Sequence, residues 1–307
     1  MIGIREIATY IPQAFESNLD KLEKFKITED FIAEKIGVRR VSRRAPDEDT
    51  SDLCLAALEK LKAKTDLDLS TIDCIILCSQ NPDENGLPHT SARLHGRLGL
   101  SRRCAAFDVS LGCSGFVYTL SIAKAFMEAN GMKRGLLFTA DPYSKILDPD
   151  DKNTVLLFGD GAAVTLLTDE PVFVPRRFAF DTDGTLAHAL RNIGGKLHMN
   201  GRQVFTYSAT AVPEEIRKVI AGAGLNFPDF DMFLFHQGSK YIVDTVRKRL
   251  ELPAEKVAED LTEHGNTVSS TIPILLEPMI HDEAKRRLLL CGFGVGLSTA
   301  TCILERP

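Results

Sequence analysis

Residues 103–116 read Arg-Cys-Ala-Ala-Phe-Asp-Val-Ser-Leu-Gly-Cys-Ser-Gly-Phe, and they indicate a strand, a tight turn and a helix in succession. The apolar run from Cys104 to Val109 is typical of a buried strand, and small residues form the turn that contains Cys113. The helix that follows places this thiol near free backbone N–H groups and the positive end of the helix dipole. We therefore expect the pKa of Cys113 to be lowered, because the thiolate is the nucleophilic form.

The same layout occurs a second time in the chain. Residues 256–266 read Lys-Val-Ala-Glu-Asp-Leu-Thr-Glu-His-Gly-Asn, and aligning Lys256 with Arg103 sets Asn266 opposite Cys113. Buried-strand patterns precede the two stretches at 73–78 and 231–236, and helical patterns follow those strands at 90–98 and 240–250. Further helices are predicted at 114–129 and 269–282, and further strands at 135–140, 162–167, 287–291 and 298–304.

Strands that alternate with helices favour parallel-rich sheets covered by helices. The repeated layout predicts a duplicated α/β fold, which we divide into residues 1–168 and 169–307. Equivalent turns of the two halves would meet near a pseudo-twofold axis. Cys113 and Asn266 would then face each other across one cleft, and His236, at the end of its own strand pattern, would join them.

The composition limits the classes of function. Of the 307 residues, 44% are hydrophobic and 26% charged, the balance of a globular protein, and no apolar run approaches the length of a membrane span. The net charge of −5 gives no general attraction to nucleic acid or to an anionic membrane. The first residues lack the apolar core of a signal peptide, and the seven cysteines have no paired spacing. We expect a cytoplasmic protein with reduced thiols and no metal site.

Five motifs resemble those of the β-ketoacyl-acyl-carrier-protein synthase III family, within the thiolase-fold condensing enzymes, and they span essentially the whole chain. They are Gly112-Cys-Ser-Gly115, Leu157-Phe-Gly-Asp-Gly-Ala162, Met199-Asn-Gly-Arg202, His236-Gln237 and His264-Gly-Asn-Thr267. The resemblance implies a duplicated five-layer αβαβα fold with two mixed sheets. It also implies a reaction in which a cysteine takes an acyl group from coenzyme A. Malonyl carrier protein then loses carbon dioxide and attacks the thioester; the coenzyme A thioester is a substrate, and no cofactor is expected.

The resemblance assigns the catalytic roles. Cys113 is the expected nucleophile, whereas the other six cysteines lie in apolar patterns typical of buried structural thiols. His236 and Asn266 are the expected decarboxylation pair, because two hydrogen-bond donors on the thioester oxygen stabilise the enolate that forms. The backbone N–H groups of Cys113 and Gly296 are expected to form the oxyanion hole. Two further features are interpreted as structural: His264 orders its turn, and the turn at 159–162 lacks the spacing of a phosphate loop.

The chain departs from the family in its coenzyme A site. Phe31 stands where a tryptophan is common, and Lys35 and Lys152 stand where arginines commonly flank the adenine. Lysine keeps the positive charge but loses the planar surface that stacks on a base. We expect coenzyme A to bind, with altered contacts at these three residues.

Two further segments are expected to contact protein partners. Lys240, Arg247 and Lys248 form a basic helical segment that could dock an acidic acyl carrier protein. Leu87 matches the tip of a loop that caps the acyl pocket of the partner subunit in relatives, which implies a homodimer. Leucine at a position that is often aromatic suggests a roomier acyl pocket.

Three alternatives to decarboxylative condensation stay open at this point. A specialised relative in secondary metabolism could transfer the acyl group to an alcohol, amine or aromatic acceptor instead of a malonyl thioester. Cysteine, histidine and asparagine could also form a thiol hydrolase. The third alternative is a catalytically inactive subunit of a heterodimer. The presence of all three reactive residues argues against this alternative. The acyl chain, the acceptor and the pathway are not fixed by the sequence.

Overall fold

Each half of the chain builds a mixed β-sheet, and the computed structural model describes residues 1–307 throughout. In the first sheet, β4 pairs in parallel with β5 and β6, whereas β7 is antiparallel to β6 and β1. Its order is β1 (Gly3–Tyr10), β7 (Ala162–Thr168), β6 (Arg134–Ala140), β4 (Cys74–Cys78) and β5 (Ala105–Val109). In the second sheet, β11 pairs in parallel with β12, and the other pairs are antiparallel. Its order is β11 (Met232–Phe235), β12 (Arg287–Gly294), β13 (Ser298–Glu305) and β8 (Val174–Thr182).

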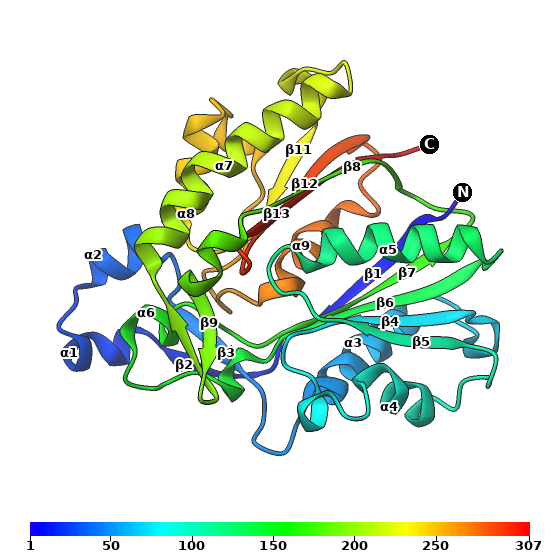
Figure 1. Ribbon diagram of the computed structural model, residues 1–307, viewed down its shortest axis with the longest axis horizontal. Helices are drawn as coiled ribbons and strands as arrows, with labels where there is room; N and C mark the ends of the chain where they lie inside the picture. Colours follow the sequence, from blue (N-terminus) through cyan, green and yellow to red (C-terminus); the bar gives the residue numbers. More distant parts are fainter.

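Helices fill three layers around these two sheets (Figure 1). Helices α5 (Gly115–Ala129) and α9 (Thr271–Leu276) lie between the sheets, and their apolar side chains form one core with the inner faces of both. Helices α3 (Thr50–Lys64) and α4 (Thr90–Arg97) cover the outer face of the first sheet. Helices α7 (Gly201–Gly222) and α8 (Lys240–Arg249) cover the second. The arrangement confirms the expected five-layer αβαβα fold.

The duplication is visible in equivalent hydrogen bonds. The Asp73 carboxylate, just before β4, accepts from the backbone N–H groups of Lys133 and Arg134 at 2.7 and 3.0 Å. The Asp231 carboxylate, just before β11, accepts from those of Arg286 and Arg287 at 2.7 and 2.8 Å. The counterpart of β5 is reduced to one parallel bridge between Phe233 and Val257, so the second sheet lacks a full fifth strand.

The central helices differ in length. Helix α5 buries Phe116, Leu120, Ala123 and Met127, as its pattern predicts, and it ends before Gly131 at a φ of 66°, a conformation that glycine adopts without steric cost. The helix predicted over 269–282 is shorter: 3₁₀ turns flank α9, which ends at Leu276. Pro278 follows within two residues, and a proline can neither donate a helical hydrogen bond nor fit behind the preceding turn.

The smaller elements gather at one end of the molecule, on the left of Figure 1, where they border the site. They are the ribbon of β2 (Ala14–Ser17) and β3 (Arg40–Arg43), the hairpin of β9 (Leu190–Ile193) and β10 (Lys196–Met199), and the short helices α1 (Leu22–Phe25), α2 (Glu29–Phe31) and α6 (Lys152–Val155). The predicted division at 168/169 falls in the connection between β7 and β8.

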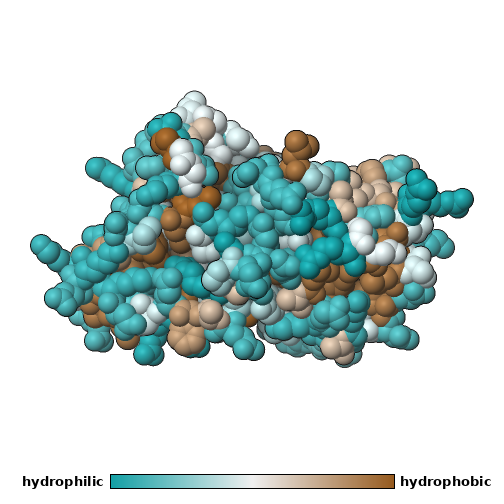
Figure 2. All heavy atoms as spheres, turned by 90° about the horizontal axis from the view of Figure 1, so that it is seen from below, coloured by the Kyte–Doolittle hydropathy of each residue, from teal (hydrophilic) through white to brown (hydrophobic).

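The face of the molecule on the side of α3 and α4 is largely hydrophilic. Apolar atoms are exposed between the polar ones in both the left-hand and the right-hand half of this view (Figure 2). None of the helices combines the length and the apolar character that crossing a bilayer requires.

Candidate active site

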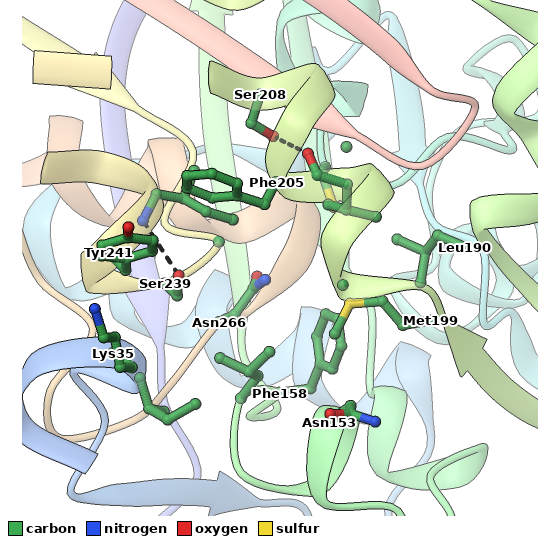
Figure 3. A pocket seen from close by; sticks show the side chains of 18 of the residues that line it. Lys35, Asn153, Phe158, Leu190, Met199, Phe205, Ser208, Ser239, Tyr241 and Asn266 are labelled. Carbon is green, nitrogen blue, oxygen red and sulfur yellow. Dashed lines mark hydrogen bonds between the residues drawn. The ribbon is translucent and has the colours of Figure 1, made fainter. Parts of the chain in front are cut away.

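A single pocket of about 340 Å³ brings together the three residues singled out in the sequence: Cys113, His236 and Asn266 all line it. The first comes from the turn before α5, the second from the end of β11 and the third from the turn before α9. In Figure 3, Asn266 lies in the middle, with Lys35 and Tyr241 on one side and Phe158 and Met199 on the other. The pocket therefore lies where the two halves meet, as the repeat predicts.

The thiol of Cys113 is held at the junction of the two halves. Its side chain is only 3% exposed. The end of β12 approaches it so closely that a Cβ at Gly292 would collide with the backbone of Cys113 and Ser114, and one at Gly294 with the sulfur. The hydroxyl groups of Ser114 and Ser298 lie 2.8 Å apart and join the turn to β13. Glycine at these two positions of β12 is a steric requirement of the site.

The predicted lowering of the Cys113 pKa is wrong for the free protein. Burial raises the pKa of this thiol to about 12, and the negative charge of Asp141 adds to the rise. The backbone N–H groups of Val295 and of Cys113 itself favour the thiolate, but their effect is smaller than the cost of desolvation. The sequence indicated the helix N-terminus correctly, whereas the depth of burial depends on packing from the other half of the chain.

The second oxyanion-hole amide, expected at Gly296, stays a prediction. The backbone N–H of the neighbouring Val295 interacts with the Cys113 sulfur. A Cβ at Gly296 would meet atoms of Ser298, and Gly296 does not line the pocket. The contact from Val295 concerns the thiolate, whereas the donors of an oxyanion hole face the substrate oxygen.

His236 is buried, with 2% exposure, and both ring nitrogens have neighbours. Nδ1 lies 2.8 Å from the Thr271 hydroxyl, which in turn lies 3.1 Å from the Val268 carbonyl oxygen. Burial lowers the pKa of His236 to about 3, so the ring is neutral near pH 7. The ring of Phe293 meets the imidazole edge-on, with centroids 5.6 Å apart. Neither Thr271 nor Phe293 was singled out from the sequence.

Asn266 is fixed by its backbone and by its side chain. Its backbone N–H donates to the Leu157 carbonyl at 2.8 Å, and its carbonyl accepts from the Gly159 N–H at 3.0 Å. The side-chain Oδ1 accepts from the Val268 N–H at 2.8 Å, so Nδ2 is the group that faces His236, 3.4 Å from its Nε2. The turn at 159–162 is thus a structural support for Asn266, as interpreted from the sequence.

A buried carboxylate connects the two catalytic turns. Asp141, with no exposed surface, accepts from the Gln80 N–H at 2.7 Å and from the Ser269 hydroxyl at 2.5 Å. Gln80 lies against Gly112, and Ser269 follows the Asn266 turn. Burial raises the pKa of Asp141 to about 6 against the opposing effect of these donors. A lone Asp after an apolar run gave no signal of this role in the sequence.

The three residues expected to contact coenzyme A all line the pocket. The Lys152 ammonium lies 5.7 Å from the centre of the Phe31 ring, and the Lys35 ammonium 4.0 Å from that of Tyr241. Tyr241 also stacks on Phe205, with centroids 5.1 Å apart. Two cation–aromatic pairs therefore border the opening, and the second pair was not anticipated from the sequence.

The four residues expected to contact proteins do not line the pocket. Leu87 is 86% exposed at the tip of its loop. On α8, the charges of Lys240 and Arg247 are partly neutralised by Asp244, at 3.0 and 3.5 Å. Lys248 is exposed and makes no ion pair. Their roles toward a partner subunit and a carrier protein stay predictions.

Comparison with known proteins agrees with this geometry. The family described as 3-oxoacyl-[acyl-carrier-protein (ACP)] synthase III matches residues 107–184, and its C-terminal part matches residues 220–306. The β-ketoacyl-[acyl-carrier-protein] synthase III of Lactococcus lactis subsp. lactis (strain IL1403) is 30% identical over 324 residues, with 98% of each chain covered. A solved 3-oxoacyl-(acyl-carrier-protein) synthase III is 35% identical, with a TM-score of 0.92 and 99% of both chains covered. The β-ketoacyl-[acyl carrier protein] synthase III of Thermus thermophilus is 31% identical, with a TM-score of 0.91 and the same coverage.

The fold, the shared pocket and these matches define the class of protein as an acyl-transferring condensing enzyme with a thiolase-like fold. Within that class, the chain belongs to the 3-oxoacyl-[acyl-carrier-protein] synthase III family. The resemblance seen in the five sequence motifs is thereby confirmed.

Proposed function

We propose that this enzyme condenses an acyl-coenzyme A with malonyl-acyl-carrier-protein, as the initiating step of fatty-acid synthesis, through an acyl-Cys113 intermediate. The observation that carries the proposal is the meeting of a buried thiol, a neutral imidazole and a fixed amide in one pocket. Family membership supports the same reaction, because the matched relatives are named 3-oxoacyl- or β-ketoacyl-[acyl-carrier-protein] synthase III.

In the first half-reaction, the acyl group moves from coenzyme A to Cys113. The sulfur forms a bond to the thioester carbon, the bond to the coenzyme A sulfur breaks, and the cysteine proton ends on the released thiol. The negative oxygen of the tetrahedral intermediate accepts hydrogen bonds from the N–H groups of Cys113 and Gly296. Such donors contribute roughly 3 kcal/mol each in comparable oxyanion holes. The N–H of Val295, next to Gly296, interacts with the sulfur and favours the thiolate before the transfer.

In the second half-reaction, the malonyl thioester loses carbon dioxide and its enolate carbon bonds to the acyl carbon of the acyl-cysteine. The bond from that carbon to the Cys113 sulfur breaks, and the sulfur takes up a proton to restore the thiol. Nδ2 of Asn266 and Nε2 of His236 stabilise the enolate oxygen by donating hydrogen bonds to it. Donation from Nε2 requires a neutral ring with its proton on that nitrogen. During the reaction the Thr271 hydroxyl must therefore turn from the Val268 carbonyl oxygen, to which it donates in the free protein, and donate to Nδ1 instead. The low pKa of His236 supports the neutral ring, and the 2.8 Å separation brings Nδ1 within reach of this hydroxyl.

The substrates enter by the opening that Phe31, Lys35 and Lys152 border. These residues hold the nucleotide of coenzyme A, and the narrow pocket takes its thioester arm. The exposed basic end of α8, at Lys248, contributes to docking the acidic carrier protein, with Lys240 and Arg247 beside it. The chemistry requires no cofactor, because the coenzyme A thioester is a substrate.

We also propose a homodimer in a reducing cytoplasm. β5 is an edge strand with β4 as its single neighbour. Beside it, half-buried or exposed apolar residues form a surface that we call the apolar flank: Phe107, Val109, Tyr118, Ile122, Phe126 and Phe180. A second copy would cover this flank, and the exposed Leu87 would reach its acyl pocket. Seven free cysteines support a reducing compartment.

Intact-protein mass spectrometry after exposure to acyl-coenzyme A thioesters tests the first half-reaction. We expect one acyl adduct on the wild-type protein and none on Cys113→Ala. An adduct that persists in Cys113→Ala would contradict the assignment of the nucleophile. Cleavage of a peptide substrate by the wild type, with no stable adduct, would instead favour the thiol hydrolase.

A further inference from the structure

Tyr143 is locked in place directly behind the wall of the pocket. It follows β6 in a 3₁₀ turn, and its side chain is 2% exposed. Its ring packs on Phe158, with centroids 4.9 Å apart and planes tilted by 39°. Its hydroxyl donates to Gln80 Oε1 at 3.1 Å, and Gln80 in turn lies against Gly112, the residue before the nucleophile. The ring is therefore held on one side by packing and at its tip by a hydrogen bond.

This tyrosine belongs to the apolar cluster that surrounds the thiol. Cys113, Tyr143, Phe158, Leu190 and Leu297 are all members of it. Burial raises the pKa of the Tyr143 hydroxyl well above its usual value, and a charge on Cys113 would raise it further, which agrees with their proximity. The pocket is lined by Cys113, Phe158 and Leu190 but not by Tyr143. Tyr143 thus lies outside the lining and packs against Phe158, which belongs to it.

An acyl chain on Cys113 must find its space among these side chains. The backbone around Phe158 is bridged to Asn266 and cannot retreat without moving that catalytic residue. Behind the Phe158 ring, the Tyr143 ring already occupies the space into which it could turn away from the pocket. Interiors are packed at crystal density, so a longer chain has to displace one of these rings.

We propose that Tyr143 is a specificity-determining residue that restricts the acyl donor to short chains, of the size of acetyl or propionyl. This inference rests on the acyl-Cys113 intermediate proposed above. The thioester exchange itself is unchanged: the new bond joins the cysteine sulfur to the acyl carbon, and the coenzyme A thiol leaves with the proton. This restriction is opposite to the roomier acyl pocket that Leu87 suggests from the sequence. Leu87 would border the pocket of the partner subunit, whereas Tyr143 acts on the pocket of its own subunit.

The test compares acylation rates across acetyl-, butyryl-, hexanoyl- and octanoyl-coenzyme A, followed by intact mass. In the wild type, we expect hexanoyl transfer to be at least about 10-fold slower than acetyl transfer, since one poorly accommodated methylene already costs about 10- to 200-fold. Tyr143→Leu should raise the hexanoyl-to-acetyl ratio by about 10-fold or more. Tyr143→Met is made in parallel as a substitute in case the leucine variant does not fold. The flexible methionine side chain fills irregular space in a core and still removes the ring.

Two control variants separate ring volume from other effects. Tyr143→Phe keeps the ring and loses the bond to Gln80, so its ratio should stay within about 3-fold of the wild type, well below the cost of one misfitting methylene. Tyr207→Leu alters another buried tyrosine of the same cluster, whose hydroxyl contacts Thr299 instead, and should leave the ratio unchanged.

The outcomes distinguish this inference from the proposed function. Equal wild-type rates for hexanoyl and acetyl donors, or an unchanged ratio in folded Tyr143→Leu and Tyr143→Met, would overturn the role of Tyr143 while leaving the acyl-enzyme intact. A shift of equal size in Tyr207→Leu would also overturn it, because general loosening would then explain the effect. Absence of any adduct on Cys113 from any donor would contradict the proposed function itself.

Discussion

At the scale of single residues, the reactivity of Cys113 is set by two opposing effects. Burial disfavours the thiolate, and two backbone N–H groups favour it. The first effect is larger in the free protein. Donors in an oxyanion hole contribute more as the reaction proceeds, because the negative charge moves from the sulfur to the substrate oxygen. The site is thus organised around the transition state more than around a stable thiolate.

The first prediction concerns the pH dependence of Cys113 alkylation. With a pKa near 12, the thiolate fraction of the free protein grows tenfold per pH unit throughout the range from about pH 7 to 9. The rate of iodoacetamide labelling at Cys113, measured by mass, should therefore rise about tenfold per unit without a plateau. Cys113→Ala provides the background from the other cysteines. A plateau near pH 7 would show instead the acidified thiol that the sequence suggested.

His236 and Asp141 affect stability with opposite signs. The pKa of His236 falls from 6.5 to about 3 on folding, so the unfolded chain binds its proton first, and stability is lost as the pH drops below about 6.5. The pKa of Asp141 rises from 3.8 to about 6, so this group removes stability as the pH climbs from about 4 to 6. Between about pH 4 and 6 the two effects have equal and opposite slopes, so together they leave the free energy of unfolding nearly independent of pH.

At the scale of elements, the bridge between the 157–159 segment and the Asn266 turn joins the two halves. It pairs Phe158 with Asn266 in parallel, by two backbone hydrogen bonds. Gly159 permits this contact, because a Cβ there would collide with the carbonyl oxygen of His264 and approach the Ser42 hydroxyl. The position of a catalytic amide therefore depends on a glycine far from it in the chain.

The second prediction follows from that collision. Gly159→Ala should lower the free energy of unfolding by about 2 kcal/mol or more, in the range of overpacked interiors, and should weaken decarboxylation more than acyl transfer. Chemical denaturation and the two half-reactions measure these effects. Gly184→Ala, with no atom within 4 Å of the added carbon, is the matched control and should change neither. Equal behaviour of the two variants would contradict the role of the bridge.

The strands and central helices could be predicted from the sequence because their patterns are local. Apolar runs such as 74–78 and 232–235 are buried strands, and the face of α5 follows helical spacing. The shortened α9 and the missing fifth strand of the second sheet were not predicted, because they depend on proline positions and on pairing between distant segments. In the site, motif spacing indicated Cys113, His236 and Asn266. Val295, Thr271 and Asp141 act through backbone or buried contacts, for which a single sequence carries no signal.

At the scale of the whole molecule, the duplication creates the site and leaves one sheet edge uncovered. The two halves contribute one catalytic turn each, and the pocket forms where they meet. The other end of the first sheet is β5, whose neighbours on the apolar flank are only partly buried. Unpaired, apolar edges favour association, which is why a second copy is the expected partner.

The third prediction concerns this association. Ile122, 37% exposed on the apolar flank, should lie within the dimer interface, so Ile122→Asp should convert a dimer to a monomer at micromolar concentration. Sedimentation equilibrium gives the mass. Ile193→Asp, at a residue 47% exposed on β9 and away from the flank, should leave the mass unchanged. A wild-type protein that is already monomeric, or an Ile122→Asp dimer, would contradict the proposed interface.

We propose that acyl transfer to Cys113 and decarboxylation at His236 and Asn266 are coupled in one pocket. To test this coupling, acetyl-coenzyme A and malonyl-acyl-carrier-protein are given to the enzyme, and the intact mass of both proteins is followed. We expect a β-ketobutyryl carrier formed with one equivalent of carbon dioxide, no product with Cys113→Ala, and an acylated but about 10²- to 10³-fold slower enzyme with Asn266→Ala. An acylated wild-type enzyme beside an unchanged malonyl carrier would rule out this coupling and point to a different acceptor.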